Sequence, residues 1–564
     1  MISLSDKQWF QKKININTVE KIKQDFNFSD TLSRLIVLRN YDISEIHYID
    51  NKIEIPNEFI KNKDFIQATD ILINSIKKNE NICILGDYDV DGTASTSLLV
   101  RFLNSINHPS FYYIPDREKD GYGASIKLFK KLILKKPDLI IMVDCGSTSN
   151  EAINFLKQNN IKSLIIDHHE INKPYPKANA IINPKKNDGY IKYDYLCATS
   201  LTYFFLDILI KKIKSTYDLS SMLVYVLLAT VCDVMPLRKI NKLIATNVIK
   251  DFKIKKNIAF NTLFELNKKD NKLTIDDLGF YVGPIINAGG RLGKSSYGTE
   301  LLTSDLNSVV KEKSIELIRL NEKRKFIEKN ILNEINFKKI TNENKNVVIY
   351  YNKNLNEGLI GIIAARLKDY FNKPSIVITN SNNMLKGSSR STINYNIGTL
   401  MKKLIETNII ESGGGHNLAA GFTMRKDKIE IFKKFVLKDF LEKNNNLDNY
   451  NNYDSEISPS AINKIFYNEI NKMGPFGNGN PLPIFFIKDL KILKTIILKN
   501  KHISAILKPK IGSTIRSICF NCVDTEIGNQ LLSKKKRINI IGNISENIWN
   551  NKKTIQLKIK DILI

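Results

Sequence analysis

Short apolar runs alternate with longer helical stretches between residues 80 and 185 of this chain. Three of the runs, Ile82–Leu85, Leu139–Met142 and Leu164–Ile166, end directly before acidic or histidine-bearing segments. Continuous apolar runs of this length, bounded by turn residues, are typical of buried parallel strands, and the helical stretches between them give a βαβ pattern. We therefore predict an α/β fold whose first domain is built on a parallel sheet.

The remaining pattern divides a chain that is too long for one hydrophobic core. A charged helical stretch without Gly or Pro, from Val309 to Ile335, predicts a long connector, and a strand–helix–strand pattern from 347 to 378 predicts a smaller α/β domain. An Asn-rich stretch predicts a polar linker, and the short β-like runs after it fit an OB-like β-barrel. The predicted boundaries are 1–300 for the parallel-sheet domain with an N-terminal helical region, 301–340 for the connecting helix, 341–443 for the second α/β domain, 444–456 for the linker and 457–564 for the barrel.

The composition restricts the partner and the compartment. The formal net charge of +27 favours a polyanionic partner, but Lys, Asn and Ile are abundant throughout, so a base-composition bias of the coding DNA explains the charge equally well. No apolar run is long enough to span a membrane, and the first residues lack the pattern of a secretory signal. Six cysteines are ordinary usage for a reducing compartment. We expect a cytoplasmic protein without a membrane partner.

Asp87, Asp89 and Asp91 stand two residues apart, directly after the first apolar run. Carboxylates at this spacing repel one another unless a cation neutralises them, and hard oxygen ligands suit Mg²⁺ or Mn²⁺. A solvated polar turn is the alternative. An EF-hand loop does not fit, because Gly92 follows Asp91 directly and the bidentate acid of that loop is missing.

Further candidate ligands follow the other two apolar runs. Asp144 follows the second run, and Asp167, His168 and His169 follow the third. Because ligands gather at the carboxyl ends of parallel strands, we expect these side chains at one edge of the sheet, where they suit a pair of divalent cations. Taken alone, Asp144 is more typical of a helix cap, and the histidine pair is also compatible with a chance turn. Asp233 ends an apolar helix, where an acid is costly unless it is paired or binds a metal.

Three Gly- and Ser-rich segments, which we interpret as loops, carry candidate phosphate-binding residues. Backbone N–H groups and hydroxyls around a guanidinium suit a phosphate, and a Gly-rich backbone can approach a phosphate or a sugar closely. A structural turn is the alternative in each case. The segments are Gly283–Gly293 with Arg291, Lys386–Ser391 with Ser388 and Arg390, and Glu411–His416.

These segments together resemble the motifs of RecJ-type exonucleases of the DHH phosphoesterase superfamily, including the associated DHHA1 domain. The resemblance covers roughly residues 35 to 564 in chain order. One departure lies in the second lobe, where the family usually carries Trp-His and this chain has Leu355 and Asn356. The matching motifs are Gly86–Gly92, Asp144 within Val143–Gly146, Asp167–His169, Asp233 within Thr230–Leu237, Gly283–Arg291, Gly387–Ser391, Gly414–His416 and Gly474–Pro481.

The resemblance implies a metal-dependent 5′→3′ exonuclease that hydrolyses single-stranded DNA to 5′-mononucleotides in DNA recombination and repair, with two Mg²⁺ or Mn²⁺ ions. The implied metal ligands are Asp87, Asp89, Asp91, Asp144 as a bridge, His168 and Asp233, and the implied catalytic set adds Asp167 and His169. The implied contacts to the scissile phosphate, the terminal 5′-phosphate or the DNA are His169, Arg291, Ser388, Arg390 and His416.

Two other functions fit the same motifs. A DHH-type phosphoesterase of short or cyclic nucleotides or of pyrophosphate would use the same metal chemistry, but it would not need a strand-binding barrel. A non-catalytic single-strand-binding scaffold would be expected to lack metal ligands. The resemblance also implies that the chain is a monomer whose partners are single-stranded DNA, a single-strand-binding protein, helicases and recombination factors.

Overall fold

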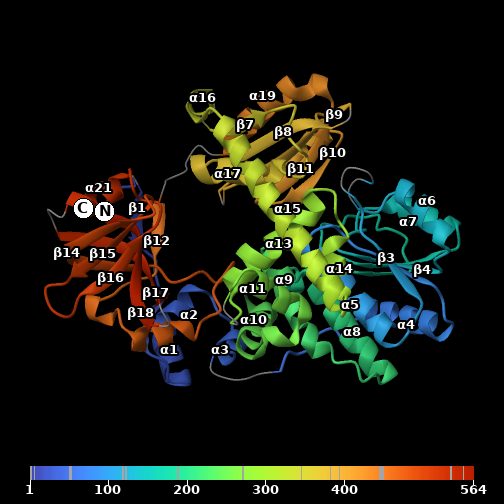
Figure 1. Cartoon of the computed structure of the whole chain (residues 1–564), viewed down its shortest axis with the longest axis horizontal. Coiled ribbons are helices and arrows are strands. Elements are labelled where there is room, and N and C mark those ends of the chain that lie inside the picture. Colours follow the sequence, from blue (N-terminus) through green and yellow to red (C-terminus); the bar gives the residue numbers. More distant parts are fainter. Residues whose placement is uncertain are drawn as a thin grey trace. The chain divides into compact units, whose positions relative to one another are not determined.

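The chain forms two compact units, which we call the sheet unit (Pro56–Met235 with Asn247–Leu447) and the barrel unit (Met1–Ile55, Pro236–Thr246 and Asp448–Ile564). Figure 1 labels their helices and strands. Within the described residues, no helix combines the length and the apolar character needed to cross a bilayer. The computed structural model describes residues 3–563 except residues 6, 50–53, 117–119, 121–122, 187–189, 270–271, 344–345, 382, 393, 444–449, 534–536 and 550–551.

The first lobe of the sheet unit contains the predicted parallel sheet, and the α/β prediction is confirmed. Its strand order is β3-β2-β4-β5-β6, and every neighbouring pair is parallel. Leu85 pairs with Met142 and Val143 pairs with Ile166, so the three predicted strands end at the same edge. The strands are β2 (Ile82–Leu85), β3 (Ser110–Tyr113), β4 (Leu139–Val143), β5 (Lys162–Ile166) and β6 (Ala180–Ile182).

Helices cover both faces of this sheet, which explains why its strands are continuously apolar. Leu128 and Phe129 of α6 (Ile126–Leu132) and Ile153 of α7 (Asn150–Gln158) pack with the strands on one face. The opposite face is covered by α4 (Lys63–Lys77), α5 (Val90–Ser105) and α8 (Ala198–Ile213) (Figure 1). The other helices of this lobe are α9 (Leu223–Cys232), the end of α10 (Lys239–Asp251), α11 (Ile258–Leu266), α12 (Ile275–Asp277), α13 (Gly283–Arg291), α14 (Tyr297–Thr303) and the connector α15 (Asn307–Glu334).

A second, mixed sheet of order β10-β11-β9-β8-β7 forms the second lobe of the sheet unit. Side chains of β8 alternate between its faces: Ile376 and Ile378 pack with α18, whereas Val377 packs with α17. The strands are β7 (Val348–Tyr351), β8 (Ser375–Ser381), β9 (Met384–Arg390), β10 (Ser412–His416) and β11 (Ala419–Met424), and the helices are α16 (Phe337–Glu343), α17 (Ile360–Phe371), α18 (Ile397–Glu406) and α19 (Ile429–Lys443).

The three Gly- and Ser-rich segments that we interpreted as loops are regular elements instead, since they form α13, β9 and β10. The glycines serve close packing. A Cβ atom on Gly290 would lie 2.5 Å from the carbonyl oxygen of Tyr88, and one on Gly387 would overlap the ring of Phe422. Sequence alone does not distinguish such packing glycines from turn glycines, because the neighbour that excludes a side chain is remote in the chain.

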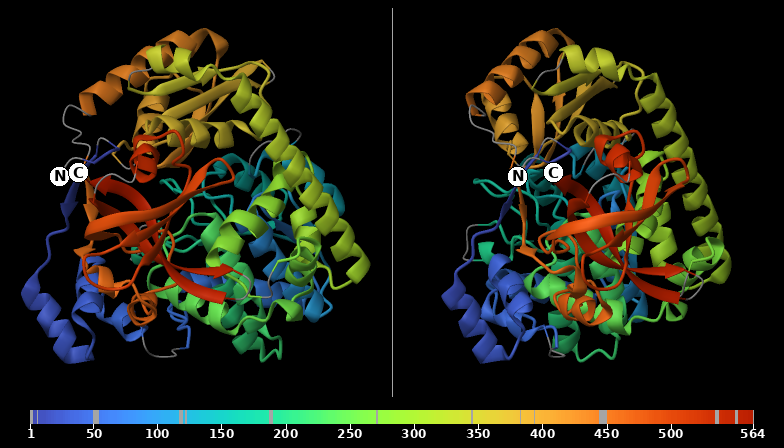
Figure 2. Two further views of the ribbon diagram at one scale, coloured as in Figure 1. Left: turned by 60° about the vertical axis from the view of Figure 1, so that its left-hand side comes forward. Right: turned by 90° about the vertical axis from the view of Figure 1, so that its left-hand side faces the viewer.

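The barrel unit contains the predicted OB-like barrel. Its five strands close through the neighbours β14–β15–β16–β18–β17–β14. Ser3 forms a β-bridge with Leu563, so the two ends of the described chain lie side by side (Figure 2). The strands are β14 (Phe485–Leu498), β15 (His502–Lys508), β16 (Ile515–Cys519), β17 (Arg537–Trp549) and β18 (Lys552–Leu563), with α20 (Lys464–Asn471) and α21 (Glu526–Ser533).

The N-terminal segment packs in the barrel unit, although we predicted it as part of a 1–300 domain. Leu32 and Leu35 belong to the same buried cluster as Phe485 and Ile487 of the barrel. These contacts join residues more than 400 positions apart in the sequence, so no local pattern indicates them. The N-terminal elements are β1 (Gln8–Gln11), α1 (Ile16–Phe26), α2 (Asp30–Leu38) and α3 (Ile43–His47).

The predicted polar linker, 444–456, is partly a pair of strands. Residues 444–449 lie outside the described residues, but β12 (Tyr450–Tyr453) pairs in parallel with β1, and β13 (Ser455–Glu456) pairs with β14. Between them, the buried carboxylate of Asp454 accepts hydrogen bonds from Arg39 at 3.0 and 3.1 Å and from the backbone N–H of Ile484 at 2.8 Å. An ion pair with a remote arginine therefore orders a stretch whose composition favours disorder.

Loss of Arg39 is expected to destabilise the barrel unit. Arg39→Ala removes the bidentate partner of the buried Asp454 carboxylate and leaves Lys12, 2.7 Å away, as its counterion, which should lower the free energy of unfolding by about 1.5–3 kcal/mol. Both tryptophans, Trp9 and Trp549, belong to the barrel unit, so urea unfolding followed by tryptophan fluorescence reports on it. Arg34→Ala, which removes a more exposed ion pair with Asp30, is the control and should cost about 1 kcal/mol or less. Equal losses in both variants would contradict the role of the buried pair.

Candidate functional site

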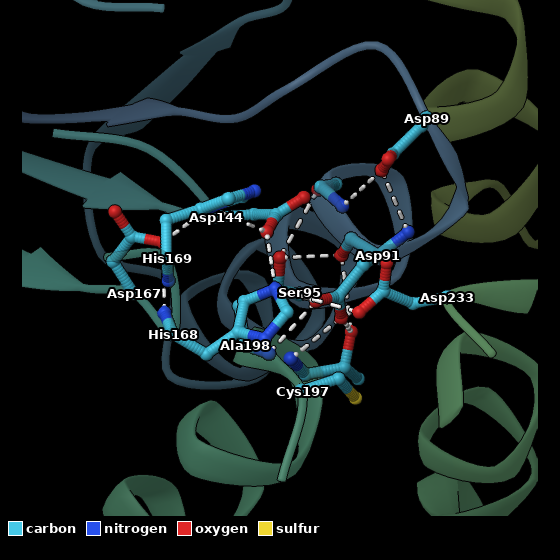
Figure 3. A network of polar contacts seen from close by, with 12 residues as sticks. Asp89, Asp91, Ser95, Asp144, Asp167, His168, His169, Cys197, Ala198 and Asp233 are labelled. Carbon is cyan, nitrogen blue, oxygen red and sulfur yellow. Dashed lines mark hydrogen bonds and ion pairs between the residues drawn. The ribbon is translucent and has the colours of Figure 1, made fainter. Parts of the chain in front are cut away.

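Acids and imidazoles meet at the carboxyl edge of the parallel sheet, as Figure 3 shows. Asp87, Asp89 and Asp91 follow β2 or open α5, Asp144 follows β4, and Asp233 ends α9. The sequence therefore predicted correctly that these side chains come together. Three overlapping groups have candidate ligand atoms within 4.8 Å of one another: Asp144, His168 and His169; Asp91, His168 and Asp233; and Asp87, Asp89 and Asp144.

His168 lies at the centre of these acids. Its Nε2 atom is 3.4 Å from Asp144 Oδ1, 3.5 Å from Asp233 Oδ2 and 3.6 Å from Asp91 Oδ2. His168 Nε2 and Asp144 Oδ1 are buried, and neither has a hydrogen-bond partner among the described residues. Burial and the charge of His169 lower the pKa of His168 to about 4, so its imidazole is neutral and can ligate a metal. A buried imidazole nitrogen and a buried carboxylate oxygen without hydrogen-bond partners fit a divalent cation.

Asp144 experiences the largest accumulation of negative charge. Burial, followed by the charges of Asp91, Asp89, Asp87 and Asp233, raises the pKa of Asp144 well above its ordinary value. Its backbone has a left-handed φ of 60°, a strained conformation for an acidic residue directly after a strand. Asp144 belongs to two of the three candidate ligand groups, so its carboxylate is the best placed to bridge two cations.

Helix N-termini hold Asp89 and Asp91 in place. The carboxylate of Asp89 caps α5 by accepting hydrogen bonds from the N–H groups of Asp91 and Gly92 at 3.0 and 3.1 Å. The carboxylate of Asp91 accepts hydrogen bonds from the N–H groups of Ala198 and Thr199 at 2.7 and 2.8 Å, at the start of α8. Each carboxylate oxygen has a second lone pair, so these bonds orient the acids and leave capacity for a metal.

The carboxylate of Asp167 orients His168 and His169 through hydrogen bonds. Its Oδ1 accepts hydrogen bonds from the N–H of His168 at 2.8 Å and from Nδ1 of His169 at 2.8 Å, and its Oδ2 accepts one from the N–H of Ser147 at 3.1 Å. Burial opposes ionisation of Asp167, but the charge and hydrogen bond of His169 outweigh it, and the pKa of Asp167 is lowered. Burial likewise disfavours the charged form of His169, yet Asp167 raises the pKa of His169 to about 10. His169 is therefore a protonated, half-exposed donor suited to a phosphate.

The structure adds residues that the sequence analysis missed. The side-chain amide of Asn183, just after β6, donates hydrogen bonds to Ser147 Oγ at 2.8 Å and to the carbonyl of His169 at 2.9 Å. Its Oδ1 accepts one from the N–H of Lys185, whose ammonium pairs with Glu170 at 3.3 Å. Asn183 could have been predicted from the sequence, because it follows the apolar run of β6. The candidate acids follow β2, β4 and β5 in the same way.

The predicted phosphate-binding residues gather around the start of α17, Arg291 from the first lobe and Ser388 and Arg390 from the second. Arg291, at the end of α13, donates a hydrogen bond from Nη1 to the carbonyl of Gly358 at 2.9 Å. Arg390 donates one from Nη1 to Ser388 Oγ at 3.2 Å, and a Cβ atom on Gly361 would lie 3.1 Å from Arg390 and 3.2 Å from Ser388. Two guanidiniums and a hydroxyl therefore lie against the stretch Gly358–Gly361, at the positive end of the α17 dipole.

His416, at the end of β10, connects this cluster electrostatically to the metal centre. Partial burial, followed by the positive charges of Arg390, Lys185 and His169, lowers the pKa of His416. These charges come from both lobes of the sheet unit, Arg390 from the second and Lys185 and His169 from the first.

Comparison with known proteins identifies three domains in this chain. The model of the DHH family N-terminal domain matches residues 81–230, that of the DHHA1 domain residues 344–442, and that of the RecJ OB domain residues 453–561. The single-stranded-DNA-specific exonuclease RecJ of Haemophilus influenzae is 29% identical over 497 residues, which cover 84% of this chain and 86% of the relative. The protein of the same name from Bacillus subtilis is 26% identical over 575 residues, covering 99% of this chain and 71% of the relative.

The fold agrees with these matches. The crystal structure of Thermus thermophilus RecJ in complex with Mn²⁺ superposes with a TM-score of 0.82 at 20% identity, covering 99% of this chain and 79% of that chain. The Mg²⁺ complex of the same protein superposes with a TM-score of 0.75 at 19% identity, covering 98% of this chain and 78% of that chain.

Substitution of Asp144 should separate electrostatic stability from metal binding. Asp144→Asn removes one charge from the buried acids, so the melting temperature of the metal-free protein should rise, as measured by calorimetry in EDTA. Mn²⁺ at about 100 times its Kd should stabilise the unsubstituted protein by about 2.7 kcal/mol and the variant far less. Asp194→Asn, at an exposed acid of the same unit, is the control and should change neither quantity. An unaltered response to Mn²⁺ in Asp144→Asn would exclude Asp144 as a ligand.

Proposed function

We propose that this chain, a member of the RecJ-type branch of the DHH superfamily, is a metal-dependent 5′→3′ exonuclease that hydrolyses single-stranded DNA to 5′-mononucleotides. It carries DHH, DHHA1 and RecJ OB domains in that order. The observation that supports this most directly is the buried pair of His168 Nε2 and Asp144 Oδ1, which has no partner among the described residues and faces Asp91 and Asp233. Such a donor set suits cations that act on a phosphodiester. A role in DNA recombination and repair follows from this activity.

The residues of the metal centre divide the chemistry between them. Bound Mg²⁺ or Mn²⁺ ions lower the pKa of a water ligand and stabilise charge on the attacking and leaving oxygens. We propose that Asp144 bridges two such ions and that Asp87, Asp89, Asp91, His168 and Asp233 complete their ligands. His169, which Asp167 holds protonated and oriented, donates to the scissile phosphate. Asp167 is thus a positioning residue for the reaction.

The preference for a chain end is proposed to arise at the start of α17, where Arg291 of the first lobe meets the second lobe. We propose that Arg291, Ser388 and Arg390 bind the terminal 5′-phosphate at the first turn of α17, with His416 facing the strand between this cluster and the metal centre. A phosphate held at a fixed place relative to the metals determines where the backbone is cut, and hydrolysis at that place releases a mononucleotide. A chain without a 5′-phosphate should bind less tightly.

The barrel unit is proposed to hold the rest of the strand. It combines basic residues with exposed rings such as Phe520, which is 51% exposed and lies edge-on to His502 at a centroid distance of 5.3 Å. Stacking of a base on an aromatic ring contributes about 1–3 kcal/mol and tolerates any sequence. We further propose that the protein acts as a cytoplasmic monomer and works with a single-strand-binding protein, helicases and recombination factors.

Cleavage and binding should separate at Asp144. An oligonucleotide with a labelled 5′-phosphate is expected to release labelled mononucleotide with Mn²⁺ and none in EDTA, and the equivalent duplex should be resistant. Asp144→Ala should lower turnover at least about a thousandfold, because the loss of a bridging ligand removes the nucleophilic water, whereas the Kd for the strand should change little. Retained turnover would contradict the metal bridge. Faster hydrolysis of a dinucleotide than of the long strand would favour the small-substrate alternative.

Recognition of the end should depend on Arg390. Arg390→Ala is expected to reduce kcat/KM for a 5′-phosphorylated oligonucleotide by about tenfold or more, because a charge-assisted hydrogen bond is lost. The value for the same oligonucleotide with a 5′-hydroxyl should change much less. Arg425→Ala, at an exposed arginine of the same lobe, is the matched control. Equal losses on both oligonucleotides would show that Arg390 does not bind the end.

A further inference from the structure

Asn356 lies in the segment that leads into α17, close to Arg291, Ser388 and Arg390, which we call the arginine cluster. The segment runs from Asn352 to Leu359, between β7 and the helix, and it meets α13 of the first lobe at Gly358. None of the roles assigned so far includes Asn356. Its side chain nevertheless accepts a hydrogen bond from the N–H of Gly358, the residue whose carbonyl Arg291 contacts.

A chain of two hydrogen bonds connects Asn356 to Arg291. Asn356 Oδ1 accepts a hydrogen bond from the N–H of Gly358 at 2.8 Å. The carbonyl of the same glycine accepts one from Arg291 Nη1 at 2.9 Å. A fixed N–H at Gly358 holds the peptide group between Glu357 and Gly358, and so restricts the backbone whose carbonyl accepts the hydrogen bond from Arg291.

The approach of the two lobes at this point is too close for a side chain. Gly358 is buried, and a Cβ atom there would overlap the carbonyl oxygen of Arg291 and lie 3.1 Å from its Cα and 3.0 Å from Asn356 Oδ1. Backbone from the first lobe therefore packs directly on backbone from the second. The position of Arg291 cannot adjust without moving the segment that carries Asn356.

Two further contacts connect the same segment to the strands beneath the cluster. Thr379 Oγ1 of β8 donates a hydrogen bond to the carbonyl of Leu355 at 2.8 Å. The carboxylate of Glu357 pairs with Lys386 at 2.6 Å, and Lys386 lies on β9 two residues before Ser388. The residues on both sides of Asn356 are thus tied to the sheet that carries Ser388 and Arg390. Asn356 adds the connection to Arg291.

We propose that Asn356 is a positioning residue that, through Gly358, holds Arg291 beside Arg390 and Ser388 and so sets the recognition of a 5′-phosphate. The inference rests on the proposed function, in which these three residues bind the end of the strand. Position 356 therefore requires a side chain whose oxygen reaches the N–H of Gly358, as the oxygen of Asn or Asp does. Asn356 does not touch the substrate itself.

The test compares two oligonucleotides of one sequence, with a 5′-phosphate or a 5′-hydroxyl. Asn356→Ala should lower the ratio of their kcat/KM values about three- to tenfold, the factor expected for one neutral hydrogen bond. The loss should appear in KM for the phosphorylated strand, with kcat on the hydroxyl strand unchanged. Asn356→Asp, which keeps the acceptor, should restore the ratio. Asn354→Ala, at an exposed asparagine two positions earlier, is the matched control.

A double-mutant cycle decides whether Asn356 acts through Arg291. In an Arg291→Gln background, Asn356→Ala should have no further effect on the ratio, and an additive effect would overturn the proposal. If Asn356→Ala does not fold, Asn356→Gln replaces it, because the longer side chain displaces the acceptor and retains the amide. An unchanged ratio in these variants would also overturn the proposal. If the unsubstituted protein itself shows no preference for the 5′-phosphate, the end-binding part of the proposed function fails instead.

Discussion

Like charges buried at the edge of a parallel sheet are the constraint on which this structure depends. Burial and mutual repulsion raise the pKa values of Asp144 and Asp233 well above their ordinary range. The fold neutralises part of this charge with N–H groups at helix starts, which hold Asp89 and Asp91. His168 Nε2 and Asp144 Oδ1, which lie 3.4 Å apart, have no hydrogen-bond partner among the described residues. The remaining imbalance is the physical reason why a divalent cation belongs here.

The groups around the acids are arranged to fix orientation before any substrate arrives. The carboxylate of Asp167 accepts hydrogen bonds from the N–H of His168 and from Nδ1 of His169, and it keeps His169 protonated. The side-chain amide of Asn183 donates a hydrogen bond to the carbonyl of His169. Left-handed backbone at Asp144 and at Val234 stores strain at one candidate ligand and next to another, Asp233. Rigid, strained placement of this kind is typical of a site in which geometry determines the reaction. The same principle applies where the two lobes meet at Arg291 and Arg390, because Gly358 and Gly361 pack there with little space for a side chain.

Most of the first lobe was predictable because its signals are local. The apolar strands and the acids that follow them lie in contiguous segments, and parallel strands bring their carboxyl ends to one edge. The Gly- and Ser-rich segments were interpreted as loops, yet they form α13, β9 and β10 because Gly290 and Gly387 pack against remote residues. Asn183 was overlooked, since an amide lacks the chemical distinctiveness of an acid or an imidazole. The roles of the individual site residues remain proposals.

By itself, the sequence determined the order of the domains, the strand ends that carry Asp87–Asp91, Asp144 and Asp167–His169, and the chemistry those residue types favour. Only the tertiary structure decided that the N-terminal segment packs with the barrel, that Arg39 orders the stretch around Asp454, and that Asn356 connects to Arg291 through Gly358. The reason is the same in each case. Periodicity and turn chemistry act between near neighbours, whereas these contacts join residues that are distant in the chain and meet only after folding.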